Sequence, residues 1–110
     1  MAFSPYHYIQ SANTGIDNEL IAIGENSGNI KMLAVTPLTN NTSGGVSVNF
    51  YLKDSEDNKY YITYRLVVPL GSTLVIDEER LIAFNNGTTG YSLNVSTASA
   101  SDIYTVFIKK

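Results

Sequence analysis

The chain has 110 residues, a length that accommodates one domain with a sizeable hydrophobic core. Its formal net charge is −3 and its seven Lys and Arg residues are scattered, which excludes sequence-independent binding of nucleic acid through a basic surface. Cysteine is absent, which excludes a disulfide framework, a thiolate nucleophile and a cysteine-based zinc site.

Charged residues make up only 15% of the chain, against roughly 25% in an ordinary soluble domain, and Ser, Thr, Asn and Gly take their place. This composition favours β-structure and turns over solvated helices. No apolar run approaches the roughly 18 to 20 residues that span a bilayer, so no membrane segment is expected.

The N-terminal sequence MAFSPYHYIQSA is rich in large side chains, but it includes Pro5, which cannot donate a hydrogen bond to a central sheet ladder. We expect residues 1–15 to form an extended arm that precedes a β-sandwich domain over residues 16–110. The expected partner contacts of this arm are Phe3, Tyr6, His7, Tyr8 and Ile9. The alternative is that the segment packs as an edge strand on its own sandwich. The segment lacks a basic stretch followed by an apolar core, so the protein is expected to stay in the cytosol of the producing cell.

Short apolar segments separated by turn sequences follow along the chain. ELIAI is brief, and IKMLAVTPL over residues 30–38 is a continuous run typical of a strand buried on both faces. Apolar and polar residues alternate over 46–53 and again over 60–68, the period of a strand with one buried face. The polar sequence DSEDN between these two strands predicts a β-hairpin.

The second half of the chain continues in the same way. Pro69 ends a strand, STLVI predicts a short new one, and the acidic DEER over residues 77–80 is the best candidate for a single helical turn. LIAF is a brief apolar segment and NNGTTG a strong turn signal. Alternation over residues 91–95 and the sequence IYTVFIK over 103–109 predict the last two strands.

Turn signals every 8 to 12 residues or so predict an all-β protein, an antiparallel β-sandwich of jelly-roll-like type with about eight strands. Tyr60 and Tyr64 share the apolar phase of their strand and are expected to be half-buried. The expected core includes Val48, Phe50, Leu52, Ile62, Leu66, Leu74, Ile76, Leu93, Val95 and Val106.

Side chains that could carry catalysis or bind metal are few. His7 is the only histidine, and it lacks the partners that a general base or a metal ligand requires. The acidic stretches 54–57 and 77–79 could contribute oxygen ligands, but neither has the glycine turn and distal glutamate of a calcium loop. We therefore expect no catalytic residue, no cofactor and no metal site, and we expect the acidic turns to be solvated.

The eight tyrosines offer another possibility. Tyr51, Tyr61 and Tyr91 lie on or near predicted strands, where exposed rings could form a platform for stacking sugars. Tyr51 and Tyr61 are accordingly candidates for partner binding.

Three stretches resemble a group of small structural proteins from tailed bacteriophages: LTNNTSGGVSVNFYLKD, YYITYRLVVPLGSTLVIDEE and SLNVSTASASDIYTVFIK. The resemblance covers about Leu33 to Lys110, and its most specific piece is PLGSTLVID over residues 69–77. One departure is the turn at residues 86–90, where the group has Gly-Asp. The resemblance implies a small β-sandwich that decorates or cements a capsid or acts as an adaptor in the neck or tail, and it brings no catalytic residues.

The sequence and this resemblance together predict a non-enzymatic virion protein made in the host cytoplasm. Its most direct role is capsid decoration, with capsid or neck and tail proteins as partners, self-association into a homo-oligomer, and no binding to nucleic acid or membrane. Two alternatives stay open: a neck or tail adaptor or fibre-associated protein, and a carbohydrate-binding module for host attachment.

Overall fold

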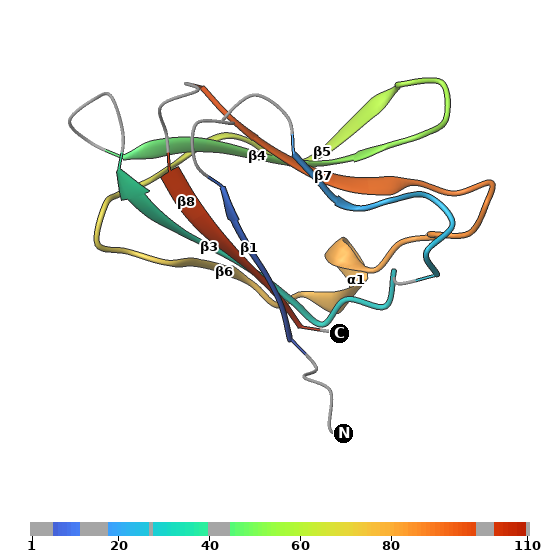
Figure 1. Cartoon of the computed structure of the whole chain (residues 1–110), viewed down its shortest axis with the longest axis horizontal. Coiled ribbons are helices and arrows are strands. Elements are labelled where there is room, and N and C mark those ends of the chain that lie inside the picture. Colours follow the sequence, from blue (N-terminus) through green and yellow to red (C-terminus); the bar gives the residue numbers. More distant parts are fainter. Residues whose placement is uncertain (1–5, 12–17, 27, 40–44, 99–102, 110) are drawn as a thin grey trace.

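A computed structural model describes residues 6–11, 18–26, 28–39, 45–98 and 103–109. The described residues form eight strands and one helical turn (Figure 1). In chain order these elements are β1 (Tyr6–Ser11), β2 (Asn18–Ile21), β3 (Met32–Thr39), β4 (Val46–Lys53), β5 (Lys59–Val68), β6 (Leu74–Ile76), α1 (Glu79–Ile82), β7 (Ser92–Thr97) and β8 (Ile103–Lys109).

The strands form two four-stranded sheets with the orders β1-β8-β3-β6 and β2-β7-β4-β5, and every neighbouring pair is antiparallel. The pairs β1·β8, β2·β7, β3·β6 and β4·β5 are those of one long hairpin folded back on itself. This is the jelly-roll topology. The predicted β-sandwich is therefore confirmed, and Figure 1 shows the two sheets as separate layers with α1 at the end where they diverge.

The core lies between the two sheets and is built from the alternating inward residues of each strand. Of the expected core residues, five are fully enclosed: Val48, Phe50, Leu93, Val95 and Val106. Four others are partly buried against them: Leu52, Ile62, Leu74 and Ile76. The prediction for Leu66 is wrong, because this side chain is 40% exposed. It lies opposite Val48, but β5 is the outermost strand of its sheet and leaves one flank of Leu66 uncovered.

One large polar side chain in the core has its hydroxyl group satisfied. Tyr104 of β8 is fully buried, and Asn18 of β2 donates a hydrogen bond from Nδ2 to the Tyr104 hydroxyl over 2.6 Å. Because a buried phenol without a partner is costly, this contact stabilises the packing of β2 on the opposite sheet.

The end of the sandwich near α1 is closed by two loops that share hydrogen bonds. Asn86 is buried in the predicted NNGTTG turn and donates from Nδ2 to the carbonyl oxygens of Ala22 and Tyr91, over 2.9 and 2.8 Å. Gly28 lies so close to the other loop that a Cβ atom there would collide with the carbonyl oxygen of Phe84. The expected helical turn is present as α1, two residues further along the chain than predicted.

The N-terminal segment was expected to be an arm or an edge strand. Residues 6–11 form β1, which pairs with β8 over six residues at the edge of its sheet, from Tyr6 opposite Lys109 to Ser11 opposite Tyr104. The rest of residues 1–15 lies outside the described part of the chain. Within the described residues, no helix has the length and apolar character needed to cross a bilayer.

Candidate interaction surface

Exposed hydrophobic side chains are concentrated on β5 and the turn that follows it. The described residues include nine large hydrophobic side chains that are exposed, and six of these lie between residues 60 and 70. We call these six the β5 strip: Tyr60, Tyr61, Tyr64, Leu66, Val67 and Leu70. The strand register places Tyr60 and Leu66 on the face of β5 that is turned to the core, and Tyr61 and Val67 on its outer face, so this edge strand exposes apolar side chains on both faces. Exposed apolar surface of this extent marks an interaction site in many proteins, which makes the β5 strip the best candidate for a binding surface.

The exposure of these residues follows from two bulges in β5. Val48 of β4 pairs with Leu66 of β5, and Tyr51 pairs with Tyr61. Between these two pairs the chain advances by three residues in β4 but by five residues in β5. The two extra residues break the strict alternation that the sequence predicted for this strand. Tyr60 and Tyr64 are 51% and 57% exposed, so about half of each side chain is buried. The expectation that both share the apolar phase of the strand is wrong for Tyr64, whose ring lies against that of Tyr61.

In the bulged region of β5, side-chain hydrogen bonds replace those of the regular backbone ladder. The Thr63 hydroxyl accepts a hydrogen bond from the Phe50 backbone N–H over 3.0 Å and donates one to the Val48 carbonyl over 3.2 Å. Arg65 has a φ angle of 54°, the left-handed region, and its N–H donates to Asn49 Oδ1 over 2.7 Å. The bulges are therefore held by specific partners on β4, which keeps the strip in one conformation.

The polar atoms of Asn49 also connect β5 to the middle of the sheet. While its Oδ1 accepts from Arg65, its Nδ2 donates to the Ser96 hydroxyl of β7 over 3.2 Å. One side chain therefore ties three neighbouring strands together.

Three tyrosines form a cluster on the outer face of this sheet. Tyr51 and Tyr61 are direct neighbours across β4 and β5, with ring centroids 5.5 Å apart, and the rings of Tyr61 and Tyr64 are 4.8 Å apart. Tyr51 occupies an outward position in β4 and is nevertheless only 1% exposed. The structure thus brings together Tyr51 and Tyr61, the two strand residues predicted to bind a partner, and adds Tyr64, which the alternation pattern had placed on the other face.

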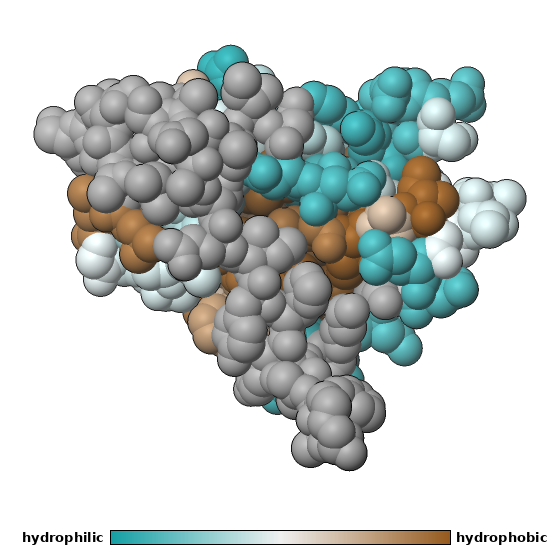
Figure 2. Space-filling view, in the orientation of Figure 1, coloured by the Kyte–Doolittle hydropathy of each residue, from teal (hydrophilic) through white to brown (hydrophobic). Residues whose placement is uncertain are grey.

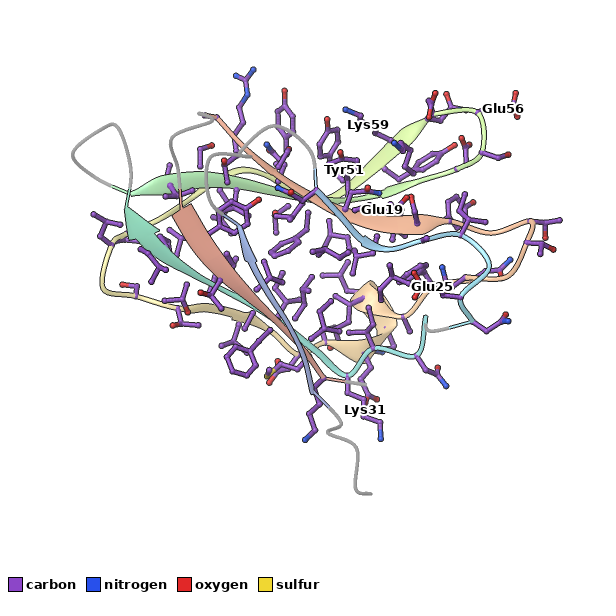
Figure 3. All side chains as sticks on the ribbon, viewed as in Figure 1. Glu19, Glu25, Lys31, Tyr51, Glu56 and Lys59 are labelled. Atoms are coloured by element: carbon purple, nitrogen blue, oxygen red, sulfur yellow. The ribbon has the colours of Figure 1, made fainter. Side chains whose placement is uncertain are left out.

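Two cations border the cluster. Lys59 Nζ lies 4.9 Å from the centre of the Tyr51 ring, and the Arg65 guanidinium lies 5.1 Å from the centre of the Tyr64 ring. Figure 3 shows Lys59 beside Tyr51 on this sheet. Cations over aromatic faces are attracted by the ring quadrupole, so the surface is aromatic in the middle with positive charge at its margins.

The geometry of the rings bears on the sugar-platform interpretation. The Tyr51 and Tyr61 rings are inclined at 51°, and the Tyr61 and Tyr64 rings at 70°. Tyr91, the third expected member, instead contacts Tyr60 edge-on at 5.8 Å. These inclined rings form a ridged aromatic surface, not a flat platform.

The hairpin tip next to the cluster is acidic and polar. Asp54 Oδ1 accepts hydrogen bonds from the backbone N–H groups of Glu56 and Asn58, over 2.9 and 3.0 Å, and its Oδ2 accepts from Asn58 Nδ2. Hydrogen bonds from Asn58 lower the pKa of Asp54 below its ordinary value of 3.8, and the Asp54 carboxylate in turn raises the pKa of Tyr60 above 10.0. Figure 2 shows hydrophilic residues gathered over this tip, where Figure 3 places Glu56.

The candidates for metal binding are not assembled into a site. No three His, Asp or Glu side chains in the described part of the chain are grouped so that they could hold a metal ion. The expectation that the acidic turns bind no metal tightly stays a prediction, and excess Ca²⁺ should leave the melting temperature nearly unchanged.

The N-terminal candidates fall at the margin of the described chain. The backbone positions of Tyr6, His7, Tyr8 and Ile9 lie in β1, opposite Lys109, Ile108, Phe107 and Val106. Phe3 lies outside the described residues, as do the side chains of β1. The role of these residues in partner binding stays a prediction.

Comparison of the chain with protein-family models, with curated proteins and with solved structures gave no match.

Proposed function

We propose that the protein is a non-enzymatic structural subunit of a tailed-bacteriophage virion, acting as a capsid decoration or cement protein. The observation that carries a binding role is the β5 strip, an exposed apolar surface on an edge strand whose bulges are fixed by side-chain hydrogen bonds. The assignment to a virion rests on the three sequence stretches that resemble phage structural proteins. The jelly-roll topology is compatible with this role, since viral coat domains are among the proteins that use it.

The chemistry of the surface supports protein binding. Tyrosine and arginine are enriched among the residues that dominate the energy of protein interfaces, and both occur here in contact with each other. The core of an interface is depleted in charge, as is this chain, in which only 15% of residues are charged. Burial of the Tyr61 and Tyr64 rings against a capsid subunit would remove apolar surface from water, with the Arg65 guanidinium at the margin of the contact.

Binding to particles that lack the protein tests this proposal. The purified chain is mixed with such capsids and sedimented, and the bound fraction is measured for wild type, Tyr64→Ser and Leu81→Ser. Leu81 is the matched control, because it is 52% exposed, like Tyr64, but lies on α1 away from the β5 strip. We expect Tyr64→Ser to weaken binding roughly tenfold or more, and Leu81→Ser to leave it unchanged.

Four outcomes would count against the proposal or part of it. Failure of the wild-type protein to bind any capsid, neck or tail component would refute the virion role. Equal effects of the two substitutions would refute the role of the β5 strip. Specific binding to a glycan in a ligand screen, lost in Tyr64→Ser, would favour host attachment. Binding to neck or tail components in place of the capsid would keep the protein in the virion but change its location.

A further inference from the structure

We propose that Asn86 is a site of spontaneous deamidation that the fold holds inactive, and that its modification is irreversible once the end of the sandwich near α1 has opened. The inference does not depend on the proposed function, since it concerns the NNGTTG turn and not the β5 strip. Asn86-Gly87 is the only asparagine-glycine pair in the chain. Deamidation is fastest at such pairs, because glycine has no side chain to hinder the approach of its own nitrogen.

The reaction at this pair needs no reagent other than water. A base in the solvent removes the Gly87 N–H proton, and the nitrogen attacks Cγ of Asn86. The new N–Cγ bond closes a succinimide ring, the Cγ–Nδ2 bond breaks, and the amide nitrogen leaves as ammonia after taking up a proton. Water then opens the ring at either carbonyl group to give aspartate or isoaspartate. An amide that donates hydrogen bonds is thereby replaced by a carboxylate that only accepts them.

The fold restrains both groups that must react. Asn86 is only 4% exposed, and its Nδ2 donates to the carbonyl oxygens of Ala22 and Tyr91 over 2.9 and 2.8 Å. The Gly87 N–H donates to Asn85 Oδ1 over 3.0 Å, a hydrogen bond that opposes the loss of its proton. The leaving group and the nucleophile are therefore both engaged in the folded chain.

The backbone of Asn86 is held by the opposite loop as well. Its carbonyl oxygen accepts hydrogen bonds from the N–H groups of Gly24 and Asn26, over 3.0 and 3.3 Å. Ring closure therefore requires the contact between the two loops to open. Only a small fraction of folded chains is open at any time, because local opening costs free energy up to that of global unfolding.

Deamidation would prevent this contact from forming again. A carboxylate at position 86 would place an acceptor oxygen where Nδ2 now donates, against the carbonyl oxygens of Ala22 and Tyr91. Acceptors that face each other in a buried site lose their hydrogen bonds, and a buried charge adds to the cost. Isoaspartate also inserts a side-chain carbon into the backbone. A chain that has reacted therefore cannot close this end of the sandwich as before.

Timed incubation in mildly alkaline buffer, and in the same buffer with enough urea to unfold the chain, tests the protection. Peptide mass spectrometry locates the modified residue. Gly87→Ala is the matched control: its Cβ would make an ordinary contact, 3.4 Å from Asn85 Oδ1, and its methyl group would hinder ring closure. In urea we expect Asn86 to be the first asparagine modified in wild type, and Gly87→Ala to react much more slowly at this position. Without urea the wild-type reaction should be slower by roughly tenfold or more.

Two results of this incubation would overturn the proposal. Equal rates at Asn86 with and without urea would show that the fold gives no protection. Earlier modification of another asparagine in urea would show that Asn86 is not the reactive site.

The consequence of the reaction is tested with Asn86→Asp, which is its product. Asn85→Asp is the control, because Asn85 is exposed and a carboxylate there keeps the oxygen that accepts from Gly87. We expect Asn86→Asp to lower the melting temperature by roughly 10 °C or more, or to prevent folding, and Asn85→Asp to change it little. Wild type that has reacted in urea should refold incompletely, whereas Gly87→Ala held in urea for the same time should refold fully. Equal melting temperatures of the two aspartate variants, or full refolding of reacted wild type, would refute the irreversible loss of the loop contact.

Discussion

Replacement of Thr63 by valine tests whether side-chain hydrogen bonds hold β5 in its bulged conformation. The two side chains have nearly the same shape, so the change removes the hydroxyl with little effect on volume. The Phe50 N–H and the Val48 carbonyl would each lose a hydrogen bond, of 3.0 and 3.2 Å respectively. An unsatisfied backbone group costs about 1 to 3 kcal/mol, and water reaches part of this site, so we expect a loss of roughly 2 to 4 kcal/mol in the free energy of unfolding.

Urea unfolding followed by circular dichroism measures this loss, and a fall of roughly 10 to 20 °C in the melting temperature should accompany it. Thr89→Val is the control, because Thr89 is an exposed residue of a turn, and its free energy of unfolding should change by no more than about 0.5 kcal/mol. If Thr63→Val is as mild as the control, the hydroxyl does not support the bulge and the fixed geometry of the β5 strip has another cause.

Three further predictions concern the core, a loop contact and pH. Leu93→Ala should lower the free energy of unfolding by about 2 to 5 kcal/mol, because Leu93 is fully buried. Leu66→Ala should lower it by less than about 1 kcal/mol, because Leu66 is 40% exposed. Equal losses in urea unfolding would show that the burial pattern is wrong. Gly28→Ala should lower the free energy of unfolding by about 3 kcal/mol or more, because the added Cβ would collide with the Phe84 carbonyl oxygen. An unchanged free energy of unfolding in the same assay would contradict the close approach of Gly28 to Phe84. Because the pKa of Asp54 is lowered in the folded state, its stabilising contribution should be complete above pH 3.8 and decline as the pH falls below that value. Asp54→Asn should flatten this acid dependence in unfolding curves; an unchanged curve would show that Asp54 is not its source.

Local features of the fold could be predicted from the sequence where short-range pattern determines structure. The strict alternation in β4 identified its buried face, and DSEDN identified the hairpin because Asp54 can bond to the backbone of its own turn. The helical turn at α1 was found within two residues because acidic residues precede an apolar pair.

The binding surface could be predicted only in part. Tyr51 and Tyr61 were identified, but Tyr64 was placed on the wrong face because the alternation rule assumes an unbroken ladder. The bulges depend on Thr63 and Asn49 reaching across to the neighbouring strand, a tertiary effect that no local pattern reveals. Leu66 was placed on the correct face, opposite Val48, but its exposure could not be predicted, since a period of two does not show which strand lies at the edge of a sheet.

The pairing of β1 with β8 could not be predicted from the sequence pattern either. The two strands lie at opposite ends of the described chain, and their register joins Tyr6 to Lys109. Pro5 argued against a central strand, and β1, which begins at the next residue, lies at the edge of its sheet. Whether the segment before β1 also contacts a partner is tested by deletion of residues 1–5, which keeps β1 (Tyr6–Ser11) in the chain. Loss of particle binding by a chain that still folds would support the arm.

The most direct test of the central proposal, that the protein is a virion subunit that assembles through the β5 strip, is cryo-electron microscopy of tailed-phage particles isolated from the source that encodes the chain. The account predicts jelly-roll density on the capsid, with Tyr61 and Tyr64 buried at a contact between subunits. Particles that lack the protein, or subunits whose β5 strip faces solvent while another surface makes every contact, would contradict it.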